Sequence, residues 1–93
     1  MEKISRSSRV IVAEDVVSCD LAGEAAILDL KEGIYYGLNP VGARIWNLLQ
    51  EPTTVDKILE VLLDEYDVEV EQCKGDVCDL IKELSDNGLV IVD

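Results

Sequence analysis

The sequence predicts an α+β fold of the winged helix-turn-helix type, with a three-stranded antiparallel sheet followed by three helices. Short runs rich in β-branched residues fill the first half, whereas apolar residues recur at helical spacing in the second. A final run, LVIV (89–92), would form a short strand or wing. With 93 residues, 48% of them hydrophobic, we expect one domain over residues 1–93 with a single core, and residues 1–8 as a flexible arm.

The predicted strands follow one another closely. They are RVIVA (9–13), VVSCDL (16–21), EAAILDL (24–30) and IYYGL (34–38). Within 24–30, Ala25, Ile27 and Asp29 share one face, and Ala26, Leu28 and Leu30 share the other. Lys-Glu-Gly at 31–33 forms a turn that returns the chain antiparallel. The segment 34–38 therefore ends a meander, with no later strand in the first half to pair with.

The first helix is predicted to begin after Asn39, which is a good N-cap, with Pro40 at the first helical position. Leu38, just before the cap, can pack against Ala43. The apolar stripe of this helix is Val41, Ile45, Leu48 and Leu49, and Pro52 ends it. Trp46, beside the stripe, is expected in the core rather than at a binding site.

Two more helices complete the predicted fold. Thr53 or Thr54 caps the second, whose buried stripe is Val55, Ile58, Leu59, Leu62 and Tyr66. The third runs from about 70 to 87, and its predicted inner face is Cys73, Val77, Leu80 and Leu84. Gly88 suits the left-handed position that ends a helix, so Leu89 can fold back onto Leu84.

Charge and composition exclude several classes of function. The net charge of −12, from 20 acidic and 8 basic residues, opposes binding to nucleic acid or to anionic membranes. No apolar run is long enough to span a membrane and no signal peptide is evident, so a cytoplasmic protein is expected. With no histidine, and with Cys19, Cys73 and Cys78 in no metal-binding spacing, we expect no cofactor, no metal site and no enzymatic activity.

Three segments together resemble a known family. They are GEAAILDLKEGIYYGLNPVGARIWNLL (23–49), DEYDV (64–68) and DVCDLIKELSDNGL (76–89). In order and spacing they resemble the PqqD-like proteins, or RiPP recognition elements, most closely the stand-alone proteins of lasso-peptide biosynthesis. The resemblance implies binding of the leader of a ribosomally made precursor peptide, as a strand added between the third strand and the third helix. It also implies a leader peptidase and a cyclase as partners. Because the family has three strands, residues 16–21 would be irregular.

The segment 34–38 indicates the same site without the family. An exposed strand edge binds other chains unless charged residues or proline protect it, and this segment contains no Lys, Glu or Pro. We therefore predict that Ile34, Tyr35, Tyr36, Gly37 and Leu38 bind the peptide, with the glycine allowing close approach of its backbone. Leu38 must face the helices, so Tyr36 should share its side and Tyr35 should face away. The open alternative is that the N-terminal strand covers this edge.

The third helix should supply the other wall of the groove. One shoulder of its inner face is acidic, with Asp76, Asp79 and Glu83. The opposite shoulder is less polar, and we predict that it contacts the peptide through Lys74, Cys78, Ile81, Lys82 and Ser85. A groove without acidic groups predicts binding that depends little on salt.

Three other functions remain as alternatives. A PqqD-type chaperone would present its peptide to a radical SAM enzyme. An acyl-carrier-like protein would suit the size and acidity, but Ser85-Asp86-Asn87 at a helix end is a poor attachment site. A DNA-reading winged helix conflicts with the acidic third helix.

Overall fold

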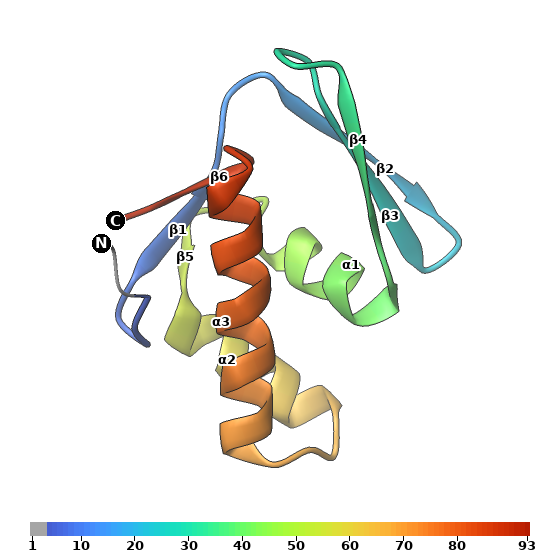
Figure 1. The fold of residues 1–93 in the computed structure, drawn as a ribbon. Coiled ribbons are helices and arrows are strands. Elements are labelled where there is room, and N and C mark those ends of the chain that lie inside the picture. Colours follow the sequence, from blue (N-terminus) through green and yellow to red (C-terminus); the bar gives the residue numbers. More distant parts are fainter. Residues whose placement is uncertain (1–3) are drawn as a thin grey trace.

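A computed structural model describes residues 4–93 of the chain (Figure 1). The elements are β1 (Arg9–Val12), β2 (Val16–Leu21), β3 (Glu24–Asp29), β4 (Ile34–Leu38), α1 (Pro40–Leu48), β5 (Thr53–Thr54), α2 (Val55–Glu65), α3 (Val70–Asp86) and β6 (Val90–Val92). Three helices and three-stranded antiparallel sheets confirm the predicted fold class. None of the helices within residues 4–93 is long and apolar enough to cross a bilayer.

The strands form two separate sheets. One has the order β2-β3-β4 and is the meander that the sequence predicts, while the other has the order β5-β1-β6. The expectation that residues 16–21 are irregular is wrong, since β2 pairs with β3 along its whole length, from Val16 opposite Asp29 to Leu21 opposite Glu24. The 9–13 segment instead contributes β1, which pairs with the C-terminal wing through Ile11 opposite Ile91.

One face of the meander packs on the helices. Ala25, Ile27 and Asp29 of β3 are buried, so the face of the strand that carries these residues is the one that packs on the helices. Asp29 is tolerated there because its Oδ1 accepts hydrogen bonds from the backbone N–H groups of Lys31 (3.0 Å) and Glu32 (3.4 Å) in the turn before β4. The buried carboxylate thus holds the hairpin turn.

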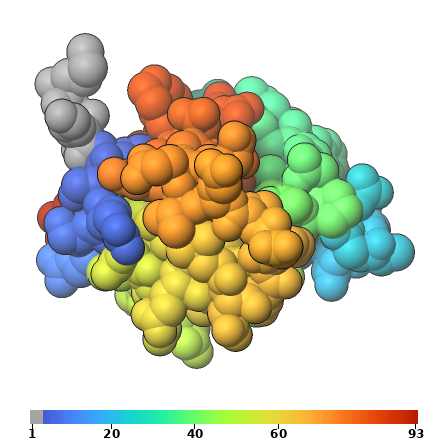
Figure 2. All heavy atoms as spheres, turned by 90° about the horizontal axis from the view of Figure 1, so that it is seen from below, coloured from blue at the N-terminus to red at the C-terminus, as the bar shows by residue number. Residues whose placement is uncertain are grey.

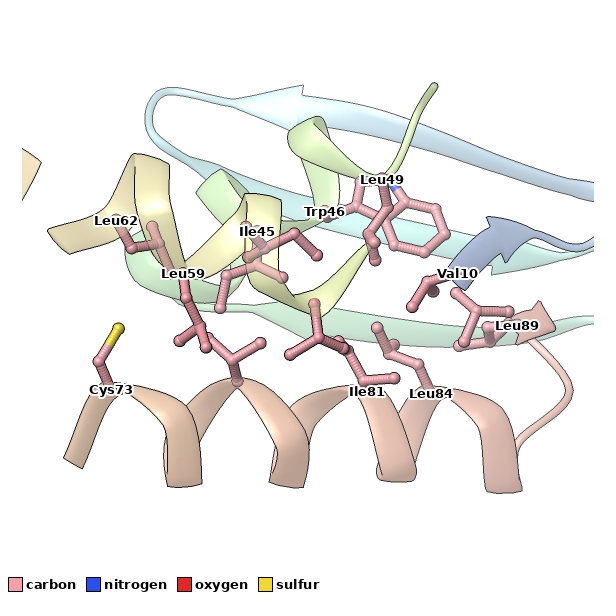
Figure 3. Close-up of a cluster of buried hydrophobic side chains, with 14 of the residues drawn as sticks. Val10, Ile45, Trp46, Leu49, Leu59, Leu62, Cys73, Ile81, Leu84 and Leu89 are labelled. Carbon is pink, nitrogen blue, oxygen red and sulfur yellow. The ribbon is translucent and has the colours of Figure 1, made fainter. Parts of the chain in front are cut away.

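The core lies between the three helices and the two sheets (Figure 3). Trp46 is buried in it, as predicted, together with Ile45 and Leu49 of the same region of the chain. Val55, Ile58, Leu59 and Leu62 form the buried face of α2. From α3, the side chains of Cys73, Val77, Ile81 and Leu84 point into the cluster.

The predicted helix ends are found in the structure. Asn39 Oδ1 accepts a hydrogen bond from Gly42 N–H (2.8 Å), and Thr54 Oγ1 accepts one from Lys57 N–H (3.2 Å). Gly88 has φ 73°, a left-handed conformation that glycine adopts without steric cost. This turn lets Leu89 N–H donate to the carbonyl of Leu84 at 2.9 Å and directs Leu89 into the core.

Residues 4–8, which the sequence predicts as part of a flexible arm, contact the start of α2. The carbonyls of Arg6 and Ser8 accept hydrogen bonds from Asp56 and Val55 N–H at the start of α2. The Arg6 side chain also forms an ion pair with Asp56 (2.8 Å). These contacts use N–H groups that a helix leaves unpaired in its first turn. The rest of the expected arm lies outside the described residues.

Candidate functional site

The edge of β4 is open. Within residues 4–93, β4 pairs only with β3, so it is an outer strand of its sheet. The alternative that the N-terminal strand covers this edge is wrong, because β1 pairs with β5 and β6. The last strand of the meander therefore presents unpaired backbone groups.

The pairing register shows which backbone groups these are. Leu30 N–H donates to the carbonyl of Asp15, so the backbone groups of Leu30 point away from β4. Because these directions alternate along a strand, Asp29 and Ile27 point toward β4 and bond Ile34 and Tyr36 opposite them. The N–H and C=O groups of Tyr35 and Gly37 then point outward from the sheet. An added strand would bond to these two residues.

Adjacent tyrosines of β4 face opposite sides of the sheet, as the sequence predicts. Tyr36 and Leu38 pack against the core, whereas Tyr35 is 72% exposed. The Tyr36 hydroxyl lies 3.4 Å from Asn87 Oδ1, to which it can donate a hydrogen bond. Tyr36 therefore spans from the strand to the C-terminal end of α3.

A groove of about 680 Å³ lies between β4, the start of α1 and α3. Its floor and sides are formed by Tyr35, Tyr36, Gly37, Leu38, Asn39, Val41, Gly42, Ile45, Asp76, Leu80, Glu83, Leu84, Asn87 and Leu89. Four of the predicted site residues, 35–38, are brought together here. Ile34 lies at the turn end of β4, is 46% exposed and does not line the groove.

The wall that α3 provides differs from the prediction. Asp76, Leu80, Glu83 and Asn87 line the groove, so the acidic shoulder of the helix faces β4. Lys74, Cys78, Lys82 and Ser85 lie on the opposite shoulder and do not line it. Figure 2 shows α3 with the N-terminal segment (blue) on one side and β4 with the start of α1 (green) on the other.

Ile81 is a core residue rather than a groove residue. Its side chain is fully buried, and Figure 3 shows it pointing from α3 into the cluster of buried apolar side chains. Leu80, predicted for the inner face, is only partly buried and reaches the groove. The buried face of α3 thus differs from the predicted stripe at one position, where Ile81 takes the place of its neighbour Leu80.

The missing side chain of Gly37 faces open space. A Cβ added at this position would meet nothing within 4 Å. Gly37 is opposite Ala26 on the face of the sheet that points away from the helices, so its missing side chain is not on the edge where a second backbone would pair. Its contribution to the site is its backbone N–H and C=O.

No group of three or more His, Cys, Asp or Glu side chains in residues 4–93 could hold a metal ion. Burial raises the pKa of the Cys73 thiol, with a smaller contribution from Asp76, which makes it a weaker nucleophile at neutral pH. The geometry instead suits an extended peptide: an open strand edge beside an apolar groove.

The comparisons with known proteins agree with this geometry. Residues 24–90 match the family described as "Coenzyme PQQ synthesis protein D (PqqD)". The chain belongs to the PqqD family. The match begins at β3 and ends in β6, so it includes every residue that lines the groove of this PqqD-family chain. No curated protein sequence matches the chain at a significant level.

Two solved structures resemble this PqqD-family chain along most of its length. "TbiB1 in Complex with the TbiA(beta) Leader Peptide" has a TM-score of 0.82 and 32% sequence identity, and the match covers 86% of this chain and 93% of that one. "Lasso peptide synthetase B1 complexed with the leader peptide" has a TM-score of 0.79 and 23% identity, with 88% and 96% covered. The second likeness shows the shared fold only.

Proposed function

We propose that this protein binds the leader of a ribosomally synthesised precursor peptide as an additional strand on β4, between β4 and α3. The open edge of β4 beside the groove is the observation that supports this function best. A similar structure, TbiB1, is in complex with a leader peptide. Strand addition would pair the free backbone groups of Tyr35 and Gly37 and bury apolar side chains in the groove.

The groove would provide the affinity. Its accessible apolar surface comes from Leu38, Val41 and Leu80, and the buried side chains of Ile45, Leu84 and Leu89 lie beneath it. Val41, in the first turn of α1, is 45% exposed, so a ligand can still cover apolar surface there. Covering such surface contributes roughly 25 cal/mol per Å². The backbone pairing would set the register of the peptide.

In this proposal the protein is a non-catalytic cytoplasmic adaptor that delivers its peptide to a leader peptidase and a cyclase of lasso-peptide maturation. The resemblance of residues 23–49, 64–68 and 76–89 to the stand-alone proteins of lasso-peptide biosynthesis supports this choice of pathway. The absence of histidine supports the lack of catalysis, since no imidazole is present to activate a cysteine or serine. Precursor peptide incubated with this protein alone should keep its mass.

The second candidate is presentation of a peptide to a radical SAM enzyme. The family description, which names coenzyme PQQ synthesis, favours it. Both candidates use the same groove and differ in the enzyme that receives the peptide. Size-exclusion chromatography of the peptide-loaded protein with a lasso leader peptidase or with a radical SAM enzyme would separate them by which one co-elutes.

Peptide binding can be tested without a known leader. Phage displaying random 15-residue peptides would be selected on immobilised protein, and the selected peptides titrated against wild type and Tyr36→Ala by fluorescence anisotropy. We expect selected peptides that bind wild type at least roughly tenfold more tightly than the variant, because Tyr36 is an aromatic side chain of the groove. Failure to select any peptide, or equal binding by a folded variant, would contradict the proposal.

A further inference from the structure

The charged side chains that line the groove are all acidic. Asp76 and Glu83 are its only charged lining residues within residues 4–93, and neither Lys nor Arg lines it. The whole chain carries a net charge of −12. A peptide entering the groove would therefore meet a negative potential from both the local wall and the rest of the molecule.

Neither carboxylate is neutralised by a basic side chain among residues 4–93. Asp76 accepts hydrogen bonds from the amide of Gln72 at 3.2 and 3.3 Å, which leaves its charge in place. Glu83 takes part in none of the ion pairs found in this part of the chain, whereas Lys82, its neighbour, pairs with Asp86. Both groove carboxylates are thus free to bind a cation from a ligand.

The two acids flank an apolar position. Asp76, Leu80 and Glu83 follow the groove side of α3, and residues 76 and 83 are roughly 10 Å apart along the helix axis. Side chains on one face of a peptide strand are spaced by about 6.6 Å. A strand lying beside α3 can therefore place one apolar side chain near Leu80 and a basic side chain two residues away near Asp76 or Glu83.

We propose that the groove selects leader segments in which Lys or Arg stands two residues from a large apolar residue, with Asp76 and Glu83 as the residues that determine this preference. The inference depends on the proposed peptide-binding function and specifies its substrate class. It also reverses the sequence-based expectation of binding that depends little on salt, because that expectation places the shoulder of α3 without acidic residues in the groove. Binding should now weaken as salt screens the carboxylates.

The test compares three proteins in the random-peptide selection. These are wild type, the groove variant Asp76→Asn/Glu83→Gln, and the control variant Asp64→Asn/Asp67→Asn. Both variants lose two negative charges, but Asp64 and Asp67 are exposed residues that do not line the groove. The control therefore separates a local effect of the groove from the effect of net charge.

We expect Lys or Arg to be enriched two positions from an apolar residue with wild type and with the control, and not with the groove variant. A selected basic peptide should lose at least about threefold in affinity for the groove variant, since exposed ion pairs contribute up to roughly fivefold each. Equal enrichment with all three proteins, or no basic preference, would overturn the inference. If peptides without basic residues are selected and still depend on Tyr36, the inference fails while the proposed function stands; if no peptide is selected, both fail.

Discussion

At the scale of single residues, the clearest contrast is between Tyr35 and Tyr36. They are adjacent, yet one is 72% exposed and the other packs on the core and reaches Asn87. This alternation could be predicted from the sequence because Leu38 must face α1 and a strand has a period of two. The consequence for binding follows directly from the side that each ring faces.

We predict that Tyr36→Ala weakens the binding of a selected peptide by at least roughly tenfold, and that Tyr35→Ala weakens it less. Tyr36 lines the groove on the side of α3, whereas most of the Tyr35 ring is in solvent. Anisotropy titration of both variants measures the difference, with circular dichroism to confirm folding. A larger effect at Tyr35 would mean that the peptide contacts the outer face of the sheet.

A substitution of Gly37 tests whether this residue contributes to peptide binding through its backbone groups alone. Because an added Cβ meets nothing within 4 Å, Gly37→Ala should leave peptide binding nearly unchanged and leave stability equal or higher by up to about 1 kcal/mol. Gly88→Ala is the control: its φ of 73° should make the substitution cost about 1 kcal/mol or more. Urea denaturation measures both values. Loss of binding in Gly37→Ala would show that the missing side chain lets the peptide backbone approach, which is the role that the sequence suggests.

At the scale of elements, α3 shows where sequence patterns stop being informative. Its apolar period predicts an amphipathic helix, and Cys73, Val77 and Leu84 are buried as expected. The pattern does not distinguish Leu80 from Ile81, since both border the stripe, nor does it show which shoulder faces β4. That orientation depends on how α2 and the turn after it direct the chain into α3, which is a tertiary property. The sequence pattern therefore predicts a groove wall on one shoulder of α3, whereas the other shoulder lines the groove.

Ile81→Ala should destabilise the fold by about 2–5 kcal/mol, because it removes a fully buried side chain and leaves a cavity. Cys78→Ala, on the partly buried shoulder of the same helix, should cost less. Chemical denaturation measures both free energies of unfolding. If Ile81→Ala kept wild-type stability and lost only peptide binding, Ile81 would belong to the groove after all.

The link between α1 and α2 predicts a specific pH dependence. Arg44 donates two hydrogen bonds to Glu65, at 2.9 and 2.6 Å, and this lowers the pKa of Glu65 below its usual value of 4.5. A lowered pKa in the folded state means that the pair stabilises the protein above the unfolded pKa and loses this effect as the pH falls through the folded pKa. The stability of wild type relative to Glu65→Gln should therefore be constant near neutral pH and decrease below about pH 4.

Denaturation of both proteins at several pH values measures this difference. Glu60→Gln is the control, since Glu60 is more exposed and its contact with Lys57 is longer, at 3.9 Å. A difference between wild type and Glu65→Gln that did not change with acid would show that the Arg44–Glu65 pair adds nothing to folding.

At the scale of the whole molecule, the two sheets explain why the edge of β4 is free. The sequence predicts each strand by its β-branched run, but the partner of β1 depends on the C-terminal wing, which is distant in sequence. By pairing with β5 and β6, β1 leaves the meander as a separate sheet with two open edges, β2 and β4. Only the β4 edge adjoins the groove and α3. The site therefore depends on a long-range pairing that local patterns do not specify.

Hydrogen exchange of backbone amides, followed by NMR with and without a selected peptide, tests strand addition most directly. The internal control is the other open edge of the sheet, on β2. There the backbone N–H and C=O groups of Val16, Ser18 and Asp20 point outward, because hydrogen-bonding directions alternate along β2 as they do along β4. We predict that the peptide slows exchange of the Tyr35 and Gly37 amides by at least roughly tenfold and leaves Ser18 and Asp20 unchanged, since only the former gain hydrogen bonds. Unchanged exchange at Tyr35 and Gly37 in the saturated complex, or protection at the β2 edge instead, would contradict peptide binding at the edge of β4.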